Sequence, residues 1–171
     1  MDITIILNAH REGSLAHPTI LSVERSRFRA HEDGLTTEVI VVLDSADADT
    51  IEQFQVHGGS DWRLEFVNFS DIGKARNYGV SRARGRYISF LDGDDLFSAN
   101  WLTLAARSAK AHFDSTIWHP ELNIYFGAQE RIFYHRDMEE APWQNAHIIA
   151  SNQSTALAFA STEYLRSVPH P

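Results

Sequence analysis

The stretch Arg86-Tyr-Ile-Ser-Phe-Leu-Asp-Gly-Asp-Asp-Leu96 decides how the rest of the chain is interpreted. Its apolar part, Tyr87 to Leu91, lies between a glycine and an acidic turn, which is typical of a buried strand. Directly after this run come three carboxylates, Asp92, Asp94 and Asp95. Carboxylates this close repel one another unless a cation lies among them, and Mg²⁺ and Mn²⁺ prefer such oxygen ligands. The alternative is a solvated acidic turn that caps the next helix.

The composition restricts the class of protein. The 171 residues, 43% of them hydrophobic, are enough for one globular domain with a core of its own. A net charge of −8 argues against a nucleic-acid-binding protein, which needs a basic face. The absence of cysteine excludes disulfides and thiolate metal sites. None of the nine histidines forms the closely spaced pairs of zinc motifs.

The N-terminal sequence indicates where the protein is located. Met1 is followed at once by a strand-like run, without the basic region that begins a signal peptide. No apolar run approaches the length of a membrane span. We therefore expect a cytoplasmic protein with no transmembrane segment.

Strands and helices alternate through the first hundred residues. Buried strands are expected at Ile3 to Leu7 and Glu38 to Leu43, with a helix from Pro18 to about Ala30 between them. Such a unit has parallel strands and a right-handed crossover. A short helix from Asp49 to about Val56 and a third, alternating strand from Trp62 to Phe66 follow.

The segment before the acidic strand predicts a helix that lies close to a neighbour. Ser70 or Asp71 can cap its start, and Gly85 is suited to end it. Small residues recur every four positions along one stripe, at Ala75, Gly79 and Ala83. Such a stripe permits close packing.

The remainder of the chain predicts a smaller mixed or antiparallel addition. The expected elements are a helix over residues 102–113 capped by Ser98 or Asn100, strands near Ile117, at 123–126, 131–134 and 156–160, an acidic loop at 138–145, and a short helix capped by Ser161. The strands at 123–126 and 131–134 are expected to pair as a hairpin. The fold class is thus α/β, a mostly parallel sheet flanked by helices, in one domain of residues 1–171 with halves at 1–97 and 98–171.

Candidate ligand-binding residues gather at one edge of this predicted sheet. Ligands of open α/β sheets bind at the carboxyl ends of the strands, which here carry the loop from His10 to Glu12, Asp44 and the three acids. The preceding helix adds the cations Lys74 and Arg76. Acids that chelate a metal beside fixed cations suit a polyanionic ligand, which indicates a nucleotide or a nucleotide-linked substrate.

Each of these residues has a structural alternative. Asp44 could cap the following helix, and His10 could be an ordinary surface histidine. Arg82, Arg84 and Arg86 are more typical of a solvated face than of a phosphate clamp. Arg76 and Asn77 are better candidates, because they lie midway along the helix beside the stripe of small residues. No glycine-rich phosphate loop is present, so phosphate charge would be neutralised by a metal and side chains.

The order of the motifs resembles that of family 2 glycosyltransferases, which have the GT-A (Rossmann-like) nucleotide-diphospho-sugar transferase fold. Four motifs carry the resemblance: the strand and loop Ile3 to Glu12, the strand Val39 to Asp44, the helix segment Gly73-Lys-Ala-Arg-Asn-Tyr-Gly79, and Phe90-Leu-Asp-Gly-Asp-Asp95, which is similar to the DXD element. The DXD-like element alone would be a weak signal, whereas the four motifs in this order are specific.

The resemblance implies an inverting transferase that moves a sugar from a nucleoside-diphospho-sugar, a UDP-sugar by analogy, to a hydroxyl of a glycan or other acceptor. The implied cofactor is Mn²⁺ or Mg²⁺. By carry-over, the nucleotide-sugar-binding residues are Ala9, His10, Glu12, Asp44, Arg76, Asp92, Gly93 and Asp94, and the metal ligands are Asp94 and Asp95. Asp44 would meet the base, Asp92 or Asp94 the ribose, and Arg76 would support the acidic cluster.

The chain departs from the family pattern in three places. Asn8-Ala-His-Arg11 stands where Pro-Thr-Tyr-Asn is more usual, and Leu43 stands where an acid is common. No catalytic base is identified, since Asp137, Glu139 and Glu140 are expected in a loop and residues 151–171 resemble the segment that precedes the family's base.

Two other functions remain open at this point. The first is a non-catalytic nucleotide-sugar-binding module, or a truncated domain of a larger glycan-assembly protein with further domains beyond residue 171. The second is a phosphatase or receiver domain, which the sequence disfavours because the acidic strand is the fourth and no lysine strand follows it.

Overall fold

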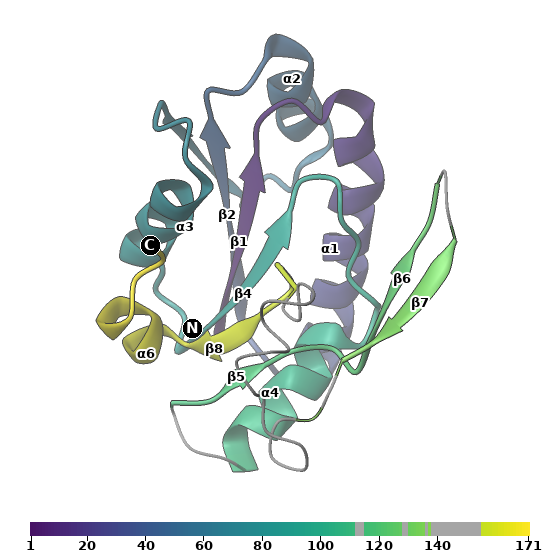
Figure 1. The fold of residues 1–171 in the computed structure, drawn as a ribbon, viewed down its shortest axis with the longest axis vertical. Helices are drawn as coiled ribbons and strands as arrows, with labels where there is room; N and C mark the ends of the chain where they lie inside the picture. The colour runs from purple at the N-terminus through teal and green to yellow at the C-terminus, as the bar shows by residue number, and fades with distance from the viewer. Residues whose placement is uncertain (112–114, 128–129, 136, 138–154) are drawn as a thin grey trace, which may run out of the picture.

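The computed structural model describes residues 1–111, 115–127, 130–135, 137 and 155–171. Its centre is a six-stranded sheet in the order β3-β2-β1-β4-β8-β5 (Figure 1). Strands β1 to β4 are parallel, β8 is antiparallel to β4, and β5 is antiparallel to β8. The strands are β1 Ile3–Ala9, β2 Thr37–Asp44, β3 Arg63–Val67, β4 Tyr87–Asp92, β5 Ile117–Trp118 and β8 Phe159–Ser161.

Helices cover both faces of the sheet. One face packs against α1 (Ala16–Glu32), α2 (Ala48–His57) and α4 (Trp101–Ala111), and the other against α3 (Ile72–Arg82) and α6 (Thr162–Ser167) (Figure 1). Adjacent strand residues contribute to opposite faces, as Ile5 and Ile6 do. Strands buried on both faces explain why β1, β2 and most of β4 are continuous apolar runs.

A separate antiparallel hairpin lies beside this sheet. It consists of β6 (Leu122–Tyr125) and β7 (Arg131–Tyr134), with Leu122 opposite Tyr134. In Figure 1 the hairpin extends past the side of α1. The predicted hairpin and the predicted α/β architecture are confirmed.

Some predicted boundaries differ from the structure. The helix expected from Pro18 begins at Ala16, and the strand expected at 156–160 lies at Phe159–Ser161. Asp71 caps α3 as expected, because its side chain accepts a hydrogen bond from the Lys74 backbone. Ser161 likewise caps α6. The acidic loop at 138–145 lies outside the described residues.

Gly85 does not end α3, contrary to the prediction. The helix ends at Arg82, and Ala83 follows in extended conformation, with φ −64° and ψ 139°. A glycine is required at position 85 for another reason, the close approach to β1, because a Cβ atom there would lie 2.4 Å from the backbone nitrogen of Thr4. The glycine permits the chain to enter β4 directly against β1.

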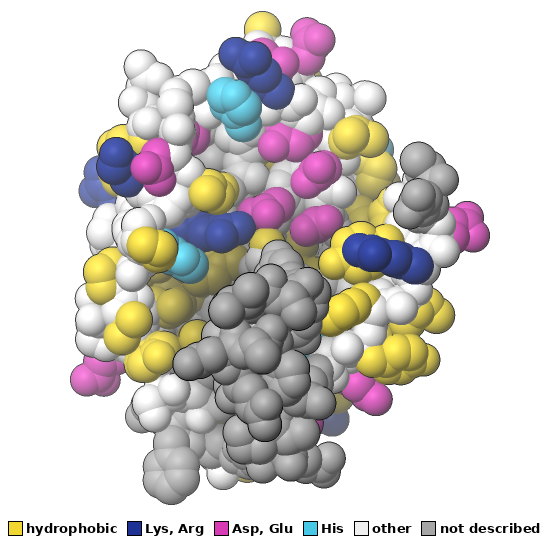
Figure 2. Space-filling model, viewed as in Figure 1, with side chains coloured by type: hydrophobic (Ala, Val, Ile, Leu, Met, Phe, Trp, Pro, Cys, Tyr) yellow, Lys and Arg dark blue, Asp and Glu magenta, His cyan; other side chains and the backbone are white. Residues whose placement is uncertain are grey.

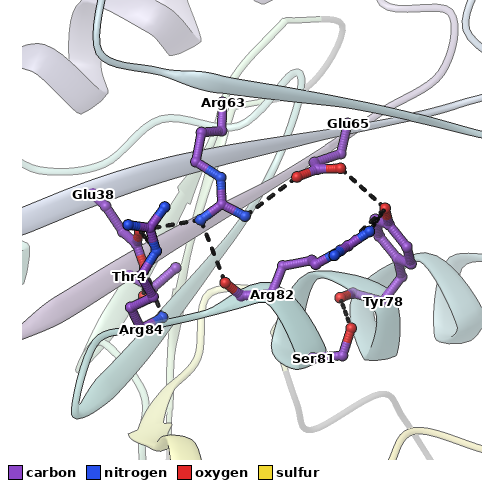
Figure 3. A network of polar contacts seen from close by, with 8 residues as sticks. All are labelled: Thr4, Glu38, Arg63, Glu65, Tyr78, Ser81, Arg82 and Arg84. Carbon is purple, nitrogen blue, oxygen red and sulfur yellow. Dashed lines mark hydrogen bonds and ion pairs between the residues drawn. The ribbon is translucent and has the colours of Figure 1, made fainter.

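Arg82, the last residue of α3, and Arg84 lie at the edge of the sheet where the strands begin (Figure 3). Glu38 is buried there, and it accepts hydrogen bonds from the Thr4 hydroxyl and the Arg84 backbone, both at 2.7 Å. The Arg63 guanidinium lies 3.4 Å from Glu38, and Arg82 donates to the hydroxyl of Tyr78. Arg82 and Arg84 therefore belong to a structural network remote from the carboxyl ends of the strands.

None of the helices in the described ranges is both long and apolar enough to cross a bilayer. The cytoplasmic location expected from the sequence stays a prediction.

The stripe of small residues on α3 gives a test of the packing. A Cβ atom at Gly79 would lie 2.7 Å from Cγ2 and 3.1 Å from Cδ1 of Ile6, a fully buried side chain. Helix propensity alone predicts that Gly79→Ala stabilises the protein by about 1 kcal/mol. Because of the clash we expect destabilisation by about 1–3 kcal/mol instead, measured by urea unfolding. A stabilised variant would contradict the close contact between α3 and β1.

Candidate functional site

The carboxyl ends of three adjacent strands bring the candidate residues together. Asn8 of β1 lies beside Asp92 of β4, and Ala9 beside Leu43 of β2. The loops after these strands begin at His10, Ser45 and Gly93. Figure 2 shows acidic side chains gathered on the face above the ends of β1 and β4. The sheet edge predicted from the sequence therefore exists in the fold.

The turn after β4 holds its carboxylates in a partly buried cluster. Arg76 of α3 pairs with Asp92, with Nη2 lying 3.0 Å from Oδ1 and 3.3 Å from Oδ2. Burial, together with the negative charges of Asp92 and Asp94, raises the pKa of Asp95 to about 6. Burial also raises the pKa of Glu12, and the charge of Asp94 contributes. The cluster thus carries more negative charge than Arg76 alone neutralises.

These carboxylates fit a divalent metal shared with a substrate. The described residues contain no group of three or more His, Cys, Asp or Glu side chains placed to hold a metal by themselves. Mg²⁺ is typically held by one or two carboxylates, with phosphates and water completing its shell. Asp94 is exposed and Asp95 is half-buried, so both can supply oxygen ligands of this kind.

Gly93 fixes the acidic turn against the end of β1. Its N–H donates to the Asn8 carbonyl at 2.8 Å, and its carbonyl accepts from the Thr19 hydroxyl at 2.9 Å. A Cβ atom at this position would lie 3.1 Å from Ala9 Cβ and from Glu12 Cδ. Ala9 is buried beneath this contact. The bottom of the site is therefore formed by the Gly93 backbone and the small Ala9 side chain.

His10 joins the loop after β1 to the loop after β2. Its ring Nδ1 lies 2.6 Å from the Asp44 carbonyl, and its own carbonyl accepts from the Asp47 backbone at 3.0 Å. The His10 N–H donates to Glu12 Oε2 at 2.7 Å. His10 is exposed, but these contacts fix its position, unlike those of an ordinary surface histidine.

Asp44 organises the loop that leads into α3. Its Oδ1 accepts from the backbone N–H groups of Phe69 and Ser70, at 2.7 and 2.9 Å, and its Oδ2 accepts from Asp71 at 3.1 Å. Burial opposes ionisation, but these hydrogen bonds lower the pKa of Asp44 below its usual value. The helix-capping alternative is wrong, because Asp47 caps α2 through the Thr50 backbone.

Three residues of this edge carry buried polar atoms that lack a hydrogen-bond partner. They are both amide atoms of Asn8, Nε of Arg76 and Nε2 of His170. Asn8 is only 4% exposed, and an unpaired polar group in such a position costs about 1–3 kcal/mol. Such groups are typical of a site completed by a ligand or by ordered water.

Asn77 fastens the C-terminal residues to α3. Its amide donates to the His170 carbonyl at 3.0 Å and accepts from the His170 N–H at 2.9 Å. The His170 ring meets Phe90 edge-on at 5.4 Å, and burial, aided by the charge of Arg76, lowers the pKa of His170. Gly73 allows the approach, because a Cβ atom there would lie 2.4 Å from the Pro171 carbonyl.

Sequence reasoning identified Asn77 as a candidate beside Arg76 but did not find His170 or Asn8. An asparagine at the end of a buried strand was the available signal for Asn8, whereas His170 is brought in by a contact across 93 positions of sequence.

Among the acids considered as a catalytic base, only Asp137 lies in the described part of the chain, and Glu139 and Glu140 lie outside it. No catalytic base is assigned.

Comparison with known proteins identifies a family match and a related fold. The family model for Glycosyl transferase family 2 matches residues 4–157. An uncharacterized glycosyltransferase of Rickettsia bellii (strain RML369-C) is 38% identical over 91 residues, which are 52% of this chain and 13% of the relative. The chain therefore spans a small part of that relative's length.

Among solved structures, residues 1–349 of S. aureus TarS share the fold. The complex with UDP has a TM-score of 0.70 at 20% identity, over 98% of this chain and 48% of that TarS fragment. The complex with UDP-GlcNAc has a TM-score of 0.71 at 20% identity, over 98% of this chain and 47% of the fragment. At this identity the likeness establishes the GT-A fold, which confirms the predicted fold class.

Replacing Asn77 tests its role in holding the C-terminal residues. Asn77→Ala removes both hydrogen bonds to His170, so we expect a loss of about 1–3 kcal/mol in the free energy of unfolding. Hydrogen exchange should become faster at the amides of Val168 and His170 before it does so in the sheet, and Pro169 and Pro171 have no amide hydrogen. Gln55→Ala, an exposed amide on α2, is the matched control. Unchanged exchange at the His170 amide would argue against the attachment.

The raised pKa of Asp95 predicts how its removal changes stability with pH. In EDTA, ionised Asp95 destabilises the fold, and this penalty develops as pH rises from the unfolded pKa near 3.8 through the folded value of about 6. Asp95→Asn should therefore be more stable than the wild type by about 1–2 kcal/mol at about pH 8, after allowance for solvent screening. At about pH 4 the difference should nearly vanish. If the wild type and Asp95→Asn have the same melting temperature at about pH 8 as well as at about pH 4, the burial of this charge is contradicted.

Proposed function

The chain belongs to glycosyl transferase family 2, and from this premise we propose that it binds a nucleoside-diphospho-sugar and transfers the sugar to an acceptor hydroxyl with inversion. The proposed donor is a UDP-sugar, which the binding of UDP and UDP-GlcNAc by TarS supports by analogy of fold. The proposed metal is Mn²⁺ or Mg²⁺.

The acidic cluster at the end of β4 carries this proposal. Asp95 is half-buried beside Asp92 and Asp94, and burial, followed by the negative charges of these two neighbours, raises its pKa. A divalent cation between the carboxylates and a diphosphate would neutralise both partners. Arg76, fixed on Asp92 at 3.0 Å, adds a permanent positive charge next to this position.

The remaining site residues suit recognition of the nucleoside. We place the base along the bridged loops of His10 and Asp44, with Ala9 and Glu12 beside the ribose. Asp92 and Asp94 face the ribose and diphosphate, and Gly93, whose N–H and carbonyl are bonded to Asn8 and Thr19, holds the turn that presents them. Asp44 acts mainly through the loop 69–71 that it holds, because both of its carboxylate oxygens already accept backbone hydrogen bonds.

The chemistry proposed is an in-line displacement. The acceptor oxygen forms a bond to the anomeric carbon, the bond to the diphosphate oxygen breaks, and the hydroxyl proton passes to a base. When bound, the metal supplies positive charge that stabilises the leaving diphosphate. Among this chain's residues, Arg76 orients Asp92, and Asp94 and Asp95 would hold the metal. We propose that the acceptor approaches from the half at 98–171.

A second candidate function is binding of the nucleotide-sugar without turnover. It is favoured by one observation, that no base is assigned among the described residues. Binding and transfer are distinguished by release of the nucleoside diphosphate, which only the transferase produces when an acceptor is present.

The donor site is tested by thermal unfolding with UDP, GDP and TDP, each with and without Mn²⁺. We expect one nucleotide to stabilise the protein only when the metal is present, by about 2.7 kcal/mol at a hundred times Kd. Asp94→Asn and Asp95→Asn should abolish the stabilisation by removing metal ligands. Asp33→Asn, an exposed acid paired with Arg107, is the control and should retain it. Stabilisation that persists in Asp94→Asn and Asp95→Asn would refute the assigned ligands, and no stabilisation by any nucleotide would refute the donor site.

A further inference from the structure

A large cavity adjoins the acidic turn on the side of α4. Its volume is about 800 Å³, and Asp95 lies in its lining. The other walls are the segments 96–98 and 118–126, α4, and residues 155–157. A ligand in this space therefore lies against a residue that we propose as a metal ligand. We call it the α4 cavity.

Aromatic and aliphatic side chains form most of the α4 cavity. Trp101 is fixed in the wall, since its indole N–H donates to the Ser89 hydroxyl at 2.8 Å and its ring meets that of Phe97 at 6.5 Å. Trp118 packs edge-on against the buried Phe159. Leu104 and Phe126 line the cavity while 54% and 64% exposed, so they offer apolar surface to an occupant.

Polar groups of the lining are partly engaged within the protein. The Asn123 amide donates to the Thr155 hydroxyl at 3.0 Å, and His119 Nδ1 lies 3.2 Å from the Leu157 carbonyl. Burial lowers the pKa of His119, which favours its neutral form. A ligand here is therefore held largely by apolar contact, with few polar groups to orient it.

The charges of the described lining disfavour an anionic occupant. Its described residues include two acids, Asp95 and Glu121, and neither a lysine nor an arginine. A phosphate group in this space would be desolvated without a cationic partner and would face like charges. This contrasts with the donor side of the turn, where Arg76 lies.

We propose that the α4 cavity binds an uncharged acceptor with an apolar body, of the class of alkyl or aryl glycosides, and presents its hydroxyl at Asp95. The volume is within the usual range of about 300–1,000 Å³ for small-ligand sites. Because Asp95 belongs both to the lining and to the acidic turn, we assign the occupant as the second substrate of the proposed transfer. The assignment as acceptor rests on the proposed function, whereas binding of such a ligand does not.

Three probes distinguish the need for an apolar chain on the ligand from the need for an uncharged head group. Octyl glucoside, used below its micelle concentration, has an apolar chain and a neutral head. Glucose lacks the chain, and octyl phosphate carries an anionic head on the same chain. Binding is followed by intrinsic fluorescence, because Trp101 and Trp118 line the cavity, and confirmed by calorimetry. Octyl glucoside should bind at least about tenfold more tightly than either of the others.

A matched pair of phenylalanines locates the binding. Phe126 lines the cavity and is 64% exposed, while Phe28 on α1 is 62% exposed and lies outside the lining. Phe126→Ala should weaken octyl glucoside binding about tenfold, and Phe28→Ala should leave it unchanged. Neither replacement removes a buried side chain, so both variants should fold.

Several outcomes would overturn the proposal. Equal binding of octyl phosphate would remove the charge argument, and equal effects of the two variants would indicate general surface adsorption of the alkyl chain. A dimer in sedimentation that Phe126→Ala dissociates would assign the surface to a second copy of the chain. Failure of nucleotide binding leaves the cavity result intact and removes only the acceptor role, so the two proposals fail separately.

Discussion

The candidate site depends on the attachment of the acidic turn to β1 through Gly93. The turn after β4 places Asp92, Asp94 and Asp95 close together, which is electrostatically unfavourable. Two hydrogen bonds to the Gly93 backbone hold it: its N–H donates to the Asn8 carbonyl, and its carbonyl accepts from the Thr19 hydroxyl. The packing of the buried sheet and α1 thus offsets the electrostatic repulsion among these carboxylates. The free energy of folding keeps the three side chains close together, where a cation can bind.

Hydrogen bonds to the backbone also explain two residues whose roles differ from those expected from the sequence. Asp44 uses its carboxylate to hold three successive backbone N–H groups, and Asn77 uses its amide to hold the backbone of His170. Both side chains are polar and lie near the site, so from sequence they resemble direct ligands. In the structure they position loop 69–71 and the C-terminal residues, which then border Arg76.

Sequence analysis predicted the architecture well because local patterns determine it. The apolar runs at β1, β2 and β4 require burial on both faces, and the turns and caps between them, such as Asp71 and Ser161, are local signals. The error at Gly85 has a physical reason, since the glycine is needed by the distant backbone of Thr4 and not by its own helix. His170 was missed for the same reason: its contacts join elements far apart in sequence.

Asp95 separates two environments of opposite character. Towards α3, Arg76 and the unpaired polar atoms of Asn8 suit a charged, hydrogen-bonding ligand. Towards α4, the lining in the described residues is mostly apolar, with two acids and neither a lysine nor an arginine. A diphosphate is therefore favoured on one side of the turn and disfavoured on the other, so charge keeps the proposed donor out of the α4 cavity. The half-buried carboxylate between them would then contact a metal on one side and face the incoming hydroxyl on the other. This arrangement requires no movement of the sheet, since one short turn fixed by Gly93 borders both sites.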